Sequence, residues 1–585
     1  MARPTRRSFL KNLGLGAGAL AAACRHQPAE LILPELPARA DAPWDRPNVI
    51  VILTDDQGYG DVGVHGNPDI RTPHLDRFAK DGLDFTRFYC CPVCAPTRAS
   101  FMTGRYHYRT GVIHTARGGA KMHGDEVTLA EMLRAAGYAT GLFGKWHLGD
   151  NYPMRPQDQG FEACLWHKAG GIGQSPDNPN SYLNPRLWRG GEPVQAQGYC
   201  TDVFFNAARE FMAAHRDRPF FVYLATNAPH TPLEIAQEYA EPYAAKGLDD
   251  TTARVYGMIT NIDDNVGRLL DWLDREGLRD NTLVIFFGDN GPQQERYTAH
   301  LRGRKSSAYE GGIRVPCFMQ WPAVLPGKSD VEAVAAHIDL APTILEACKT
   351  VPPPETALDG ISLLPLLRGK TKAYPDRALV LQCHRGLSPG RYHNAAVVTA
   401  RYKLVCNPGT FEREHLEADK ARVFELYDLD QDPGEQRNLA ADHPDTVAAL
   451  RAAYDAWYDD VKATRSFEPG WIHLGSPFEN PATLCRFQDQ AHTGERPRGW
   501  PVHVECGGVY EFTLERGGST DAGTLHAAFQ DNEMVRVLGD GERSALFTLP
   551  AGNGLLRVWM QRPGKPVEVA TNNDTTGDVT VRFLG

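Results

Sequence analysis

Three cysteines lie within five positions of the stretch CCPVCAPTRASFMTGR, residues 90–105. By themselves they allow a disulfide, a CxxC redox pair, a corner of a zinc site or one activated nucleophile. A redox pair needs a thioredoxin-like βαβ context, and a zinc site needs a second Cys/His pair, which the chain does not offer at suitable spacing. Pro96 fits the first turn of a helix. Cys94 would then lie at a helix N-terminus, where backbone N–H groups favour anions.

Two pairs of oxygen-bearing side chains form a second candidate group. Asp55 and Asp56 are adjacent and follow an apolar run, and Asp289 and Asn290 follow another. Two neighbouring carboxylates repel each other unless a cation lies between them. Four hard oxygen donors without an obligatory His or thiolate favour Ca²⁺, and after it Mg²⁺, over Zn²⁺. The alternative for each pair alone is an ordinary turn or helix cap.

The remaining candidates are basic. Lys145 and His147 are two positions apart, on one side of a segment expected to be extended. His230 follows a predicted strand, and Lys305 lies in a Gly-rich loop. Any one of these side chains alone would be an ordinary solvated residue. Together with Arg98 they supply three fixed positive charges and two titratable groups, which suits the transfer of a multiply charged oxyanion ester.

The elements that must position these residues follow from the apolar pattern. Residues 48–53, 220–225 and 282–287 are nearly continuous apolar runs, each followed closely by Asp, Asn or His. Helical stretches lie between them, at 128–136 and 260–276. Such alternation predicts an α/β fold with a mainly parallel central sheet flanked by helices. Ligands of such sheets gather beyond the carboxyl ends of the strands.

The chain is expected to divide into four segments. A strand at 395–405 and a helix near 444–458 predict a smaller α+β unit, and later strands alternate apolar and polar residues in the manner of an antiparallel, sandwich-like domain. The predicted segments are an export signal with its linker (1–45), a catalytic domain (46–375), an α+β subdomain (376–465) and an accessory β-rich domain (466–585).

The N-terminal residues predict export. Paired arginines, Arg6 and Arg7, precede a short Gly/Ala-rich apolar segment, in the order of a twin-arginine signal. We therefore expect a periplasmic or cell-surface protein, and Cys24 is a possible lipidation site that would anchor it to a membrane. The net charge of -10 argues against a nucleic-acid partner. Most of the isolated cysteines are expected to be core residues rather than a disulfide framework.

The order Cys94-x-Pro96-x-Arg98, completed by Thr103-Gly104-Arg105, resembles the signature of type I sulfatases, in the alkaline-phosphatase superfamily. Further blocks that look like the family's extend the resemblance over roughly residues 48–460. These blocks are Thr54–Gly58, Gly144–Gly149, Ala228–His230, Gly288–Gly291, Tyr309–Gly312 and Glu425–Gly434.

The resemblance implies a modified nucleophile and a metal ion. A separate maturation enzyme would oxidise Cys94 to Cα-formylglycine (3-oxoalanine), whose hydrate attacks sulfur. Ca²⁺ would be bound by Asp55, Asp56, Asp289, Asn290 and the modified Cys94.

The resemblance also implies roles for the basic residues. Lys305 and His230 would bind the sulfate and assist protonation of the leaving oxygen. His147 would remove the proton that lets sulfate depart, and Arg98 and Lys145 would hold the hydrated aldehyde.

The predicted function is hydrolysis of a sulfated glycan or an aryl sulfate. The alternatives are a phosphonate or phosphate ester hydrolase and a catalytically decayed glycan-binding relative. His167-Lys168 and His384-Arg385 are either sugar-subsite residues or ordinary surface loops, and Arg304 is expected to face solvent. The sequence indicates neither the oligomeric state nor the regiospecificity.

Overall fold

The computed structural model describes residues 46–116, 118–370, 374–386, 388–413, 416, 421–468, 470–485, 488, 499–515, 521–561 and 578–585. The predicted export signal and Cys24 lie outside the described residues. Among the helices that are described, none is both long enough and apolar enough to cross a bilayer.

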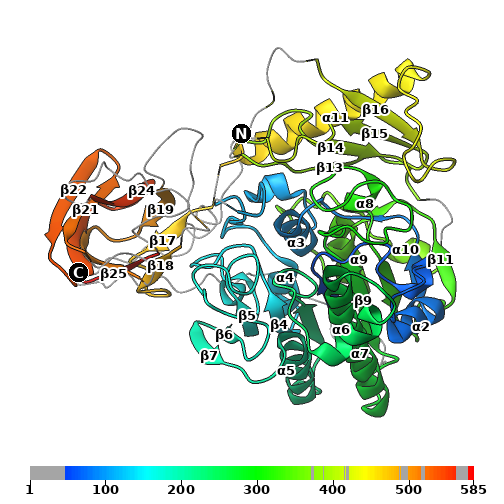
Figure 1. The fold of residues 1–585 in the computed structure, drawn as a ribbon, viewed down its shortest axis with the longest axis horizontal. Helices are drawn as coiled ribbons and strands as arrows, with labels where there is room; N and C mark the ends of the chain where they lie inside the picture. The colour runs from blue at the N-terminus through cyan, green and yellow to red at the C-terminus, as the bar shows by residue number, and fades with distance from the viewer. Residues whose placement is uncertain are drawn as a thin grey trace.

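A ten-stranded mixed sheet forms the centre of the molecule (Figure 1). Its middle strands β9, β1, β8, β4 and β5 are mutually parallel, and antiparallel pairs flank them on both sides. The apolar runs at 48–53, 220–225 and 282–287 are β1, β8 and β9, as predicted. In sheet order the strands are β11 (Ser329–Val331), β2 (Leu83–Phe85), β10 (Cys317–Gln320), β9 (Thr282–Gly288), β1 (Asn48–Thr54), β8 (Phe220–Ala225), β4 (Ala139–Lys145), β5 (Ala163–His167), β6 (Arg186–Arg189) and β7 (Glu192–Gln195).

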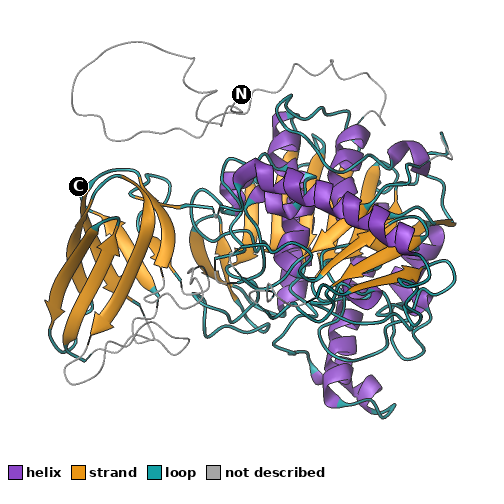
Figure 2. Ribbon diagram, turned by 90° about the horizontal axis from the view of Figure 1, so that it is seen from above, coloured by secondary structure: helices purple, strands orange, loops and turns teal. Residues whose placement is uncertain are grey.

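Helices cover both faces of this sheet (Figure 2). Val49, Val51 and Leu53 of β1 pack into one core with α3 (Cys94–Thr103), α4 (Leu129–Ala135) and α9 (Leu340–Ala347). Ile50 and Ile52 pack into the opposite core, which contains α2 (Pro73–Asp81), α5 (Cys200–Ala214) and α7 (Asp250–Arg275). Burial on both faces explains why the strand is a continuous apolar run, and it leaves the strand ends for polar residues.

Predicted helix positions hold, with shifted ends. The stretch 128–136 is α4, whose N-cap Thr128 accepts the backbone N–H of Glu131 in a capping box. The stretch 260–276 is only the second part of α7, which begins at Asp250. Shorter elements complete this part: α6 (Gln237–Ala244), α8 (Glu310–Ile313), α10 (Leu364–Leu367), and the paired strands β3 (Phe88–Tyr89) and β12 (Ala335–Ala336).

A four-stranded antiparallel sheet with one long helix follows. Its strands are β13 (Leu379–Gln382), β14 (Ala395–Val398), β15 (Tyr402–Cys406) and β16 (Phe424–Asp428), and its helix is α11 (Pro444–Arg465). The single strand predicted at 395–405 is wrong: the segment is a hairpin, because Thr399 and Tyr402 bond across a turn between β14 and β15. Apolar residues on both sides of a short turn concealed the break.

Two antiparallel-rich sheets make up the C-terminal part, called here the C-terminal β domain. The strands alternate buried and more exposed residues, as in β20 and β21, and their inner faces share one core. The fold class predicted from the sequence is therefore confirmed. One sheet is β17 (Ile472–Leu474), β19 (Gly499–Val504), β24 (Gly552–Gln561), β21 (Gly523–Phe529) and β22 (Asn532–Leu538), and the other is β18 (Ala482–Leu484), β25 (Val579–Phe583), β20 (Gly508–Leu514) and β23 (Ser544–Leu549).

Candidate active site and metal centre

The polar residues selected from the sequence meet at the carboxyl edge of the central sheet. Four strand ends supply most of them: β1, β9, β4 and β8. The sequence-predicted site residues that are buried there are Asp55, Asp56, Cys94, Arg98, Lys145, His147, His230, Asp289 and Asn290; Lys305 is partly exposed.

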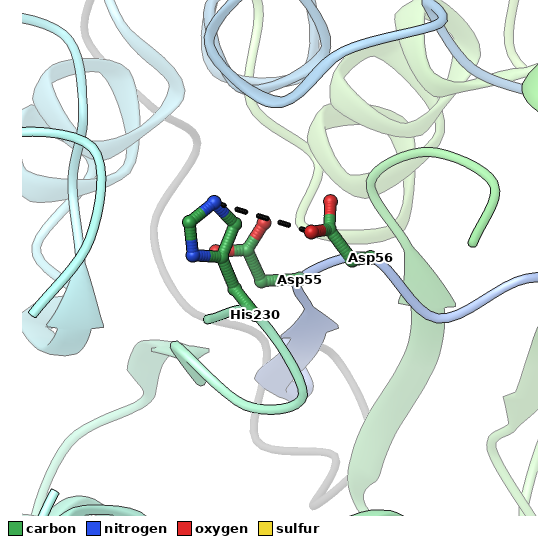
Figure 3. A group of neighbouring side chains, drawn as sticks. All are labelled: Asp55, Asp56 and His230. Atoms are coloured by element: carbon green, nitrogen blue, oxygen red, sulfur yellow. Dashed lines mark ion pairs between the residues drawn. The ribbon is translucent and has the colours of Figure 1, made fainter. Parts of the chain in front are cut away.

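The acidic residues form one group around the end of β1. The backbone N–H of Asp56 donates to Asp289 Oδ1 at 3.1 Å, and Asn290 Nδ2 donates to Asp56 Oδ1 at 2.8 Å. Asp56 has a positive φ of 65°, so the backbone leaves the strand and turns its carboxylate toward the same space as that of Asp55. Figure 3 shows these two carboxylates together with the His230 imidazole.

Several oxygens of this group have no hydrogen-bond partner. Asp55 Oδ1, Asp56 Oδ2 and Asn290 Oδ1 are buried and unpartnered. One potential ligand atom from each of Asp55, Cys94 and Asp289 lies within 4.8 Å of the others. A buried carboxylate oxygen without a donor is costly unless a cation satisfies it. The donor set therefore fits a metal ion that prefers oxygen ligands.

Fixed cations balance the carboxylates. Lys145 Nζ lies 2.5 Å from Asp55 Oδ2, and Lys305 Nζ lies 2.6 Å from Asp56 Oδ1. Burial alone would raise the pKa of Asp56, but the charges of Lys305 and His230 hold it well below its usual range. The carboxylate of Asp56 is consequently ionised and available as a ligand.

Asp289 is held by a guanidinium. Arg98 donates to its Oδ2 through Nε and a terminal nitrogen, at 3.1 and 2.7 Å. Arg98 also donates to the backbone carbonyl of Lys145 at 3.2 Å, which links α3 to the end of β4. Burial, reinforced by the charge of Asp55, raises the pKa of Asp289 to about 6 in the metal-free site. A bound cation would lower that pKa, because it favours the carboxylate.

Cys94 begins α3, as predicted from Pro96, and it is buried. Burial raises the pKa of its thiol, against the lowering effect of Lys145. Every cysteine in the described part of the chain is a free thiol, so the structure contains no disulfide between Cys91 and Cys94. Instead, Cys91 Sγ lies 3.5 Å from His337 Nε2, and both residues are buried.

The two histidines approach the site from different strands. His147 has a positive φ of 61°, so the prediction that it lies with Lys145 on one side of an extended segment is wrong: β4 ends at Lys145. Its Nε2 bonds the carbonyl of Thr115 at 2.8 Å, and burial lowers its pKa well below the usual value. His230 Nε2 is 3.9 Å from Asp56 Oδ2 (Figure 3), and burial together with Lys305 lowers its pKa to about 3.

The residues weighed as sugar-subsite candidates are mostly inside the protein. His167 and Lys168 are buried, and the Lys168 ammonium lies 3.8 Å from the centre of the Trp188 ring. His384 is buried and stacks on His393. These three are therefore not ordinary surface-loop residues.

Two arginines lie nearer the solvent. Arg385 donates to Thr115 Oγ1 at 3.0 Å. The backbone carbonyl of the same threonine bonds His147 Nε2. Arg304, expected to face solvent, has a side chain that is 51% exposed.

Two supporting residues were not found from the sequence. Arg296 donates to the backbone carbonyl of Asp56 and pairs with Asp61, both at 2.7 Å. Thr97 Oγ1 donates to the backbone carbonyl of Asp289 at 2.7 Å. Both contacts hold a loop of the candidate metal site from a distant part of the chain, and no local pattern marks them. Only the position of Thr97 inside the CAPTR block was a signal.

The comparisons agree with this geometry. Residues 47–350 match the family model described as Sulfatase, and residues 303–453 match the C-terminal model of N-sulphoglucosamine sulphohydrolase. Human arylsulfatase A is 33% identical over 516 residues, covering 79% of this chain and 95% of that protein. The N-acetylgalactosamine-6-O-sulfatase of Bacteroides thetaiotaomicron is 30% identical, covering 69% and 92%.

Among solved structures, Ps i-CgsB in complex with k-i-k-neocarrahexaose superposes with a TM-score of 0.62 at 27% identity, covering 70% of this chain and 92% of that one. The chain belongs to the sulfatase family, as the type I signature indicated. It is a sulfuric ester hydrolase. The family implies a metal ion and a formylglycine, and the acidic group described above is the candidate metal site.

Proposed function

We propose that this protein removes sulfate from a sulfated carbohydrate, with a nucleophile derived from Cys94 and a Ca²⁺ ion. The observation that carries the proposal is the position of Cys94. It lies at the start of α3, with its Sγ within 4.8 Å of one carboxylate oxygen each of Asp55 and Asp289, and Asp55 also has a buried oxygen without a hydrogen-bond partner. Lysines and an arginine lie on its other sides, where a sulfate group needs positive charge.

The metal would be held by Asp55, Asp56, Asp289 and Asn290, together with the modified Cys94. Carboxylate and amide oxygens without a histidine favour Ca²⁺ over Zn²⁺. When bound, the ion would supply Lewis-acid polarisation of a sulfate oxygen and would stabilise an ionised hydroxyl of the nucleophile. Three of these ligands are held by ion pairs, Asp289 by Arg98, Asp55 by Lys145 and Asp56 by Lys305.

Conversion of Cys94 to formylglycine by a separate maturation enzyme would explain the environment of this residue. The raised pKa keeps an unmodified thiol protonated near neutral pH, which makes it a poor nucleophile. A hydrated aldehyde would provide two hydroxyls on one carbon, one to attack sulfur and one to release sulfate. Lys145 and Arg98, on the sides of Cys94, would hold those hydroxyls and balance their charge.

The histidines would move the protons. The low pKa of His147 keeps its imidazole neutral, so it can accept the hydroxyl proton whose removal frees sulfate. His230 and Lys305 lie on the side of Asp56 and would bind the sulfate. A bound sulfate group would raise the pKa of His230, because an adjacent anion favours imidazolium, and so would prepare it to protonate the leaving oxygen.

The substrate class rests on the relatives. Proteins named N-acetylgalactosamine-6-O-sulfatase or N-acetylgalactosamine-6-sulfatase, and one solved in complex with k-i-k-neocarrahexaose, are similar over more than half of this chain. Arylsulfatase A is similar too, so an aryl sulfate remains the comparison substrate. We further propose that the protein works outside the cytoplasm, on the basis of the Arg6-Arg7 signal pattern and the possible lipid anchor at Cys24.

The test is release of inorganic sulfate from a panel of sulfated oligosaccharides, with 4-nitrophenyl sulfate and a matched phosphonate ester alongside. We expect the highest kcat/KM on an oligosaccharide sulfate. Faster turnover of the phosphonate ester would refute the proposal. In the active protein the tryptic peptide containing Cys94 should be lighter by about 18 Da, the difference between cysteine and formylglycine.

A further inference from the structure

Two loops at the active-site edge are bonded to the C-terminal β domain. The first, residues 146–155, follows β4 and carries His147; the second, residues 168–177, follows β5. Both leave the central sheet at its carboxyl edge, beside the metal-binding group.

The first loop is anchored at several points. Tyr152 N–H donates to Glu479 Oε2 at 2.7 Å, and His473 N–H donates to the Tyr152 carbonyl at 3.1 Å. Asn151 Nδ2 donates to the Thr483 carbonyl at 3.1 Å. Met154, which belongs to this loop, is completely buried in the core of the C-terminal β domain. The loop that carries His147 thus ends inside that domain.

The second loop is bonded to the same domain through Ser175. Ser175 Oγ lies 2.7 Å from both carboxylate oxygens of Asp578, just before β25. The loop is also tied to the first one, because Ala169 N–H donates to both oxygens of Asp150 at 3.0 Å. Within the loop, Gln174 N–H donates to the Gly171 carbonyl and Asp177 N–H donates to the Gln174 carbonyl. These turn bonds connect the segment around Ser175 to the glycines at 170 and 171.

Those glycines pack directly against the two histidines. A Cβ on Gly170 would lie 2.5 Å from ring atoms of His147, and one on Gly171 would lie 3.1 Å from Cε1 of His230. The loop backbone is therefore in van der Waals contact with both imidazole rings. A shift of the loop would change the orientation of His147 and His230, the two groups proposed to transfer protons.

We propose that the C-terminal β domain helps to position the active-site histidines. Ser175 and Asp578 are the positioning residues, and they hold the 168–177 loop against His147 and His230. The loop backbone touches the rings of His147 and His230, so we expect its displacement to act on the steps that use these two imidazoles. The identity of the reaction rests on the proposed function, whereas the role of Ser175 and Asp578 in holding the loop rests on the contacts alone.

The experiment compares Ser175→Ala, Asp578→Ala, the double variant and Asp578→Asn with the full-length protein. Asp540→Ala is the control, since that carboxylate of the same domain accepts an exposed loop N–H, from Ala522. Steady-state kinetics use the best sulfate ester of the panel, and hydrogen exchange is followed for peptides covering 168–177. Formylglycine content at Cys94 is measured in each variant.

We expect each single variant to lose about tenfold in kcat, because misplaced catalytic groups are costly, with KM within about twofold. The double variant should be no worse than either single one, because both remove the same bond. Asp578→Asn retains an acceptor oxygen and should recover most of the activity. Amides in the loop should exchange faster in the alanine variants and at the wild-type rate in the control.

Wild-type kcat in both single variants, unchanged exchange in the loop, or a loss of kcat explained wholly by lower formylglycine content would overturn the inference. A wild-type protein that hydrolyses no sulfate ester would instead refute the proposed function. In that case the exchange measurement alone decides whether Asp578 holds the loop.

Discussion

The central sheet and the C-terminal β domain use strands in opposite ways. Every residue of β1 is buried, whereas β20 and β21 alternate buried and more exposed residues. A strand covered on both faces can carry polar side chains only at its ends, so the chemistry of this protein is concentrated at one sheet edge. A strand covered on one face carries polar residues along its whole length, and among the described residues of the C-terminal β domain no group of metal-ligating side chains is found. The central sheet therefore supplies the reactive groups, and the C-terminal β domain supplies surface and support.

The largest expected effect comes from the first residue of α3. Cys94→Ala should reduce kcat by at least about 10³-fold, because it removes the only group proposed to attack sulfur. The site is already buried and Ala fits the helix, so thermal unfolding should occur within a few degrees of wild type. Kinetics with released sulfate, together with a thermal melt, check both statements. Full activity in this variant would dismiss the formylglycine mechanism.

Removal of the metal should come next. Dialysis against a chelator is expected to abolish turnover and to lower the stability of the catalytic region, by about 2.7 kcal/mol relative to a solution at 100 times Kd. Ca²⁺ should restore both, and Mg²⁺ should restore less. The check is a calorimetric melt and an activity titration with each ion. A melt that is indifferent to chelation would contradict the assignment of the unpartnered oxygens to a metal.

A matched pair of truncations tests the two kinds of strand directly. Ile52→Ala in β1 removes a fully buried side chain and should cost about 2–5 kcal/mol of unfolding free energy. Val537→Ala in β22 shortens a side chain that is 79% exposed and should change stability by less than about 0.5 kcal/mol. Urea unfolding measures both. Similar losses at the two positions would contradict the contrast drawn here.

A smaller effect than the loss at Ile52 is expected from a pH dependence of stability at Asp263. Its carboxyl accepts the N–H groups of His74 and Leu75 at the start of α2, and burial raises its pKa to about 7 against those bonds. Between the unfolded pKa and 7 the folded state binds more protons, so this group stabilises the protein at low pH and loses that contribution as the pH rises through 7.

The test uses Asp263→Asn, which keeps an acceptor oxygen for one of the two helix N–H groups and cannot ionise. Relative to this variant, the wild type should lose on the order of 1 to 3 kcal/mol of unfolding free energy between pH 5 and pH 8. Urea titrations at the two pH values give the difference. A difference that does not change with pH would show that Asp263 titrates normally.

Much of the site was accessible from the sequence because its residues follow strand ends. Asp55 and Asp289 were located by the apolar runs before them, and Cys94 by the helix signal at Pro96. The conformation of His147 was not accessible, since its left-handed backbone depends on packing rather than on its own residue type. The hairpin of β14 and β15 was missed because its turn has no glycine or proline.

The sequence by itself determined which side chains are available and which strand ends carry them, because a strand buried on both faces appears in the sequence as a local apolar run. Only the tertiary structure decided the pairings: Arg98 with Asp289 across 191 positions, and Ser175 with Asp578 across 403. Such contacts depend on how helices and sheets pack, and the free energy that selects them comes from the whole core rather than from any neighbouring residues. For the same reason the sequence predicted the C-terminal β domain only as an accessory domain. The structure shows it bonded to the loops that carry or contact the active-site histidines.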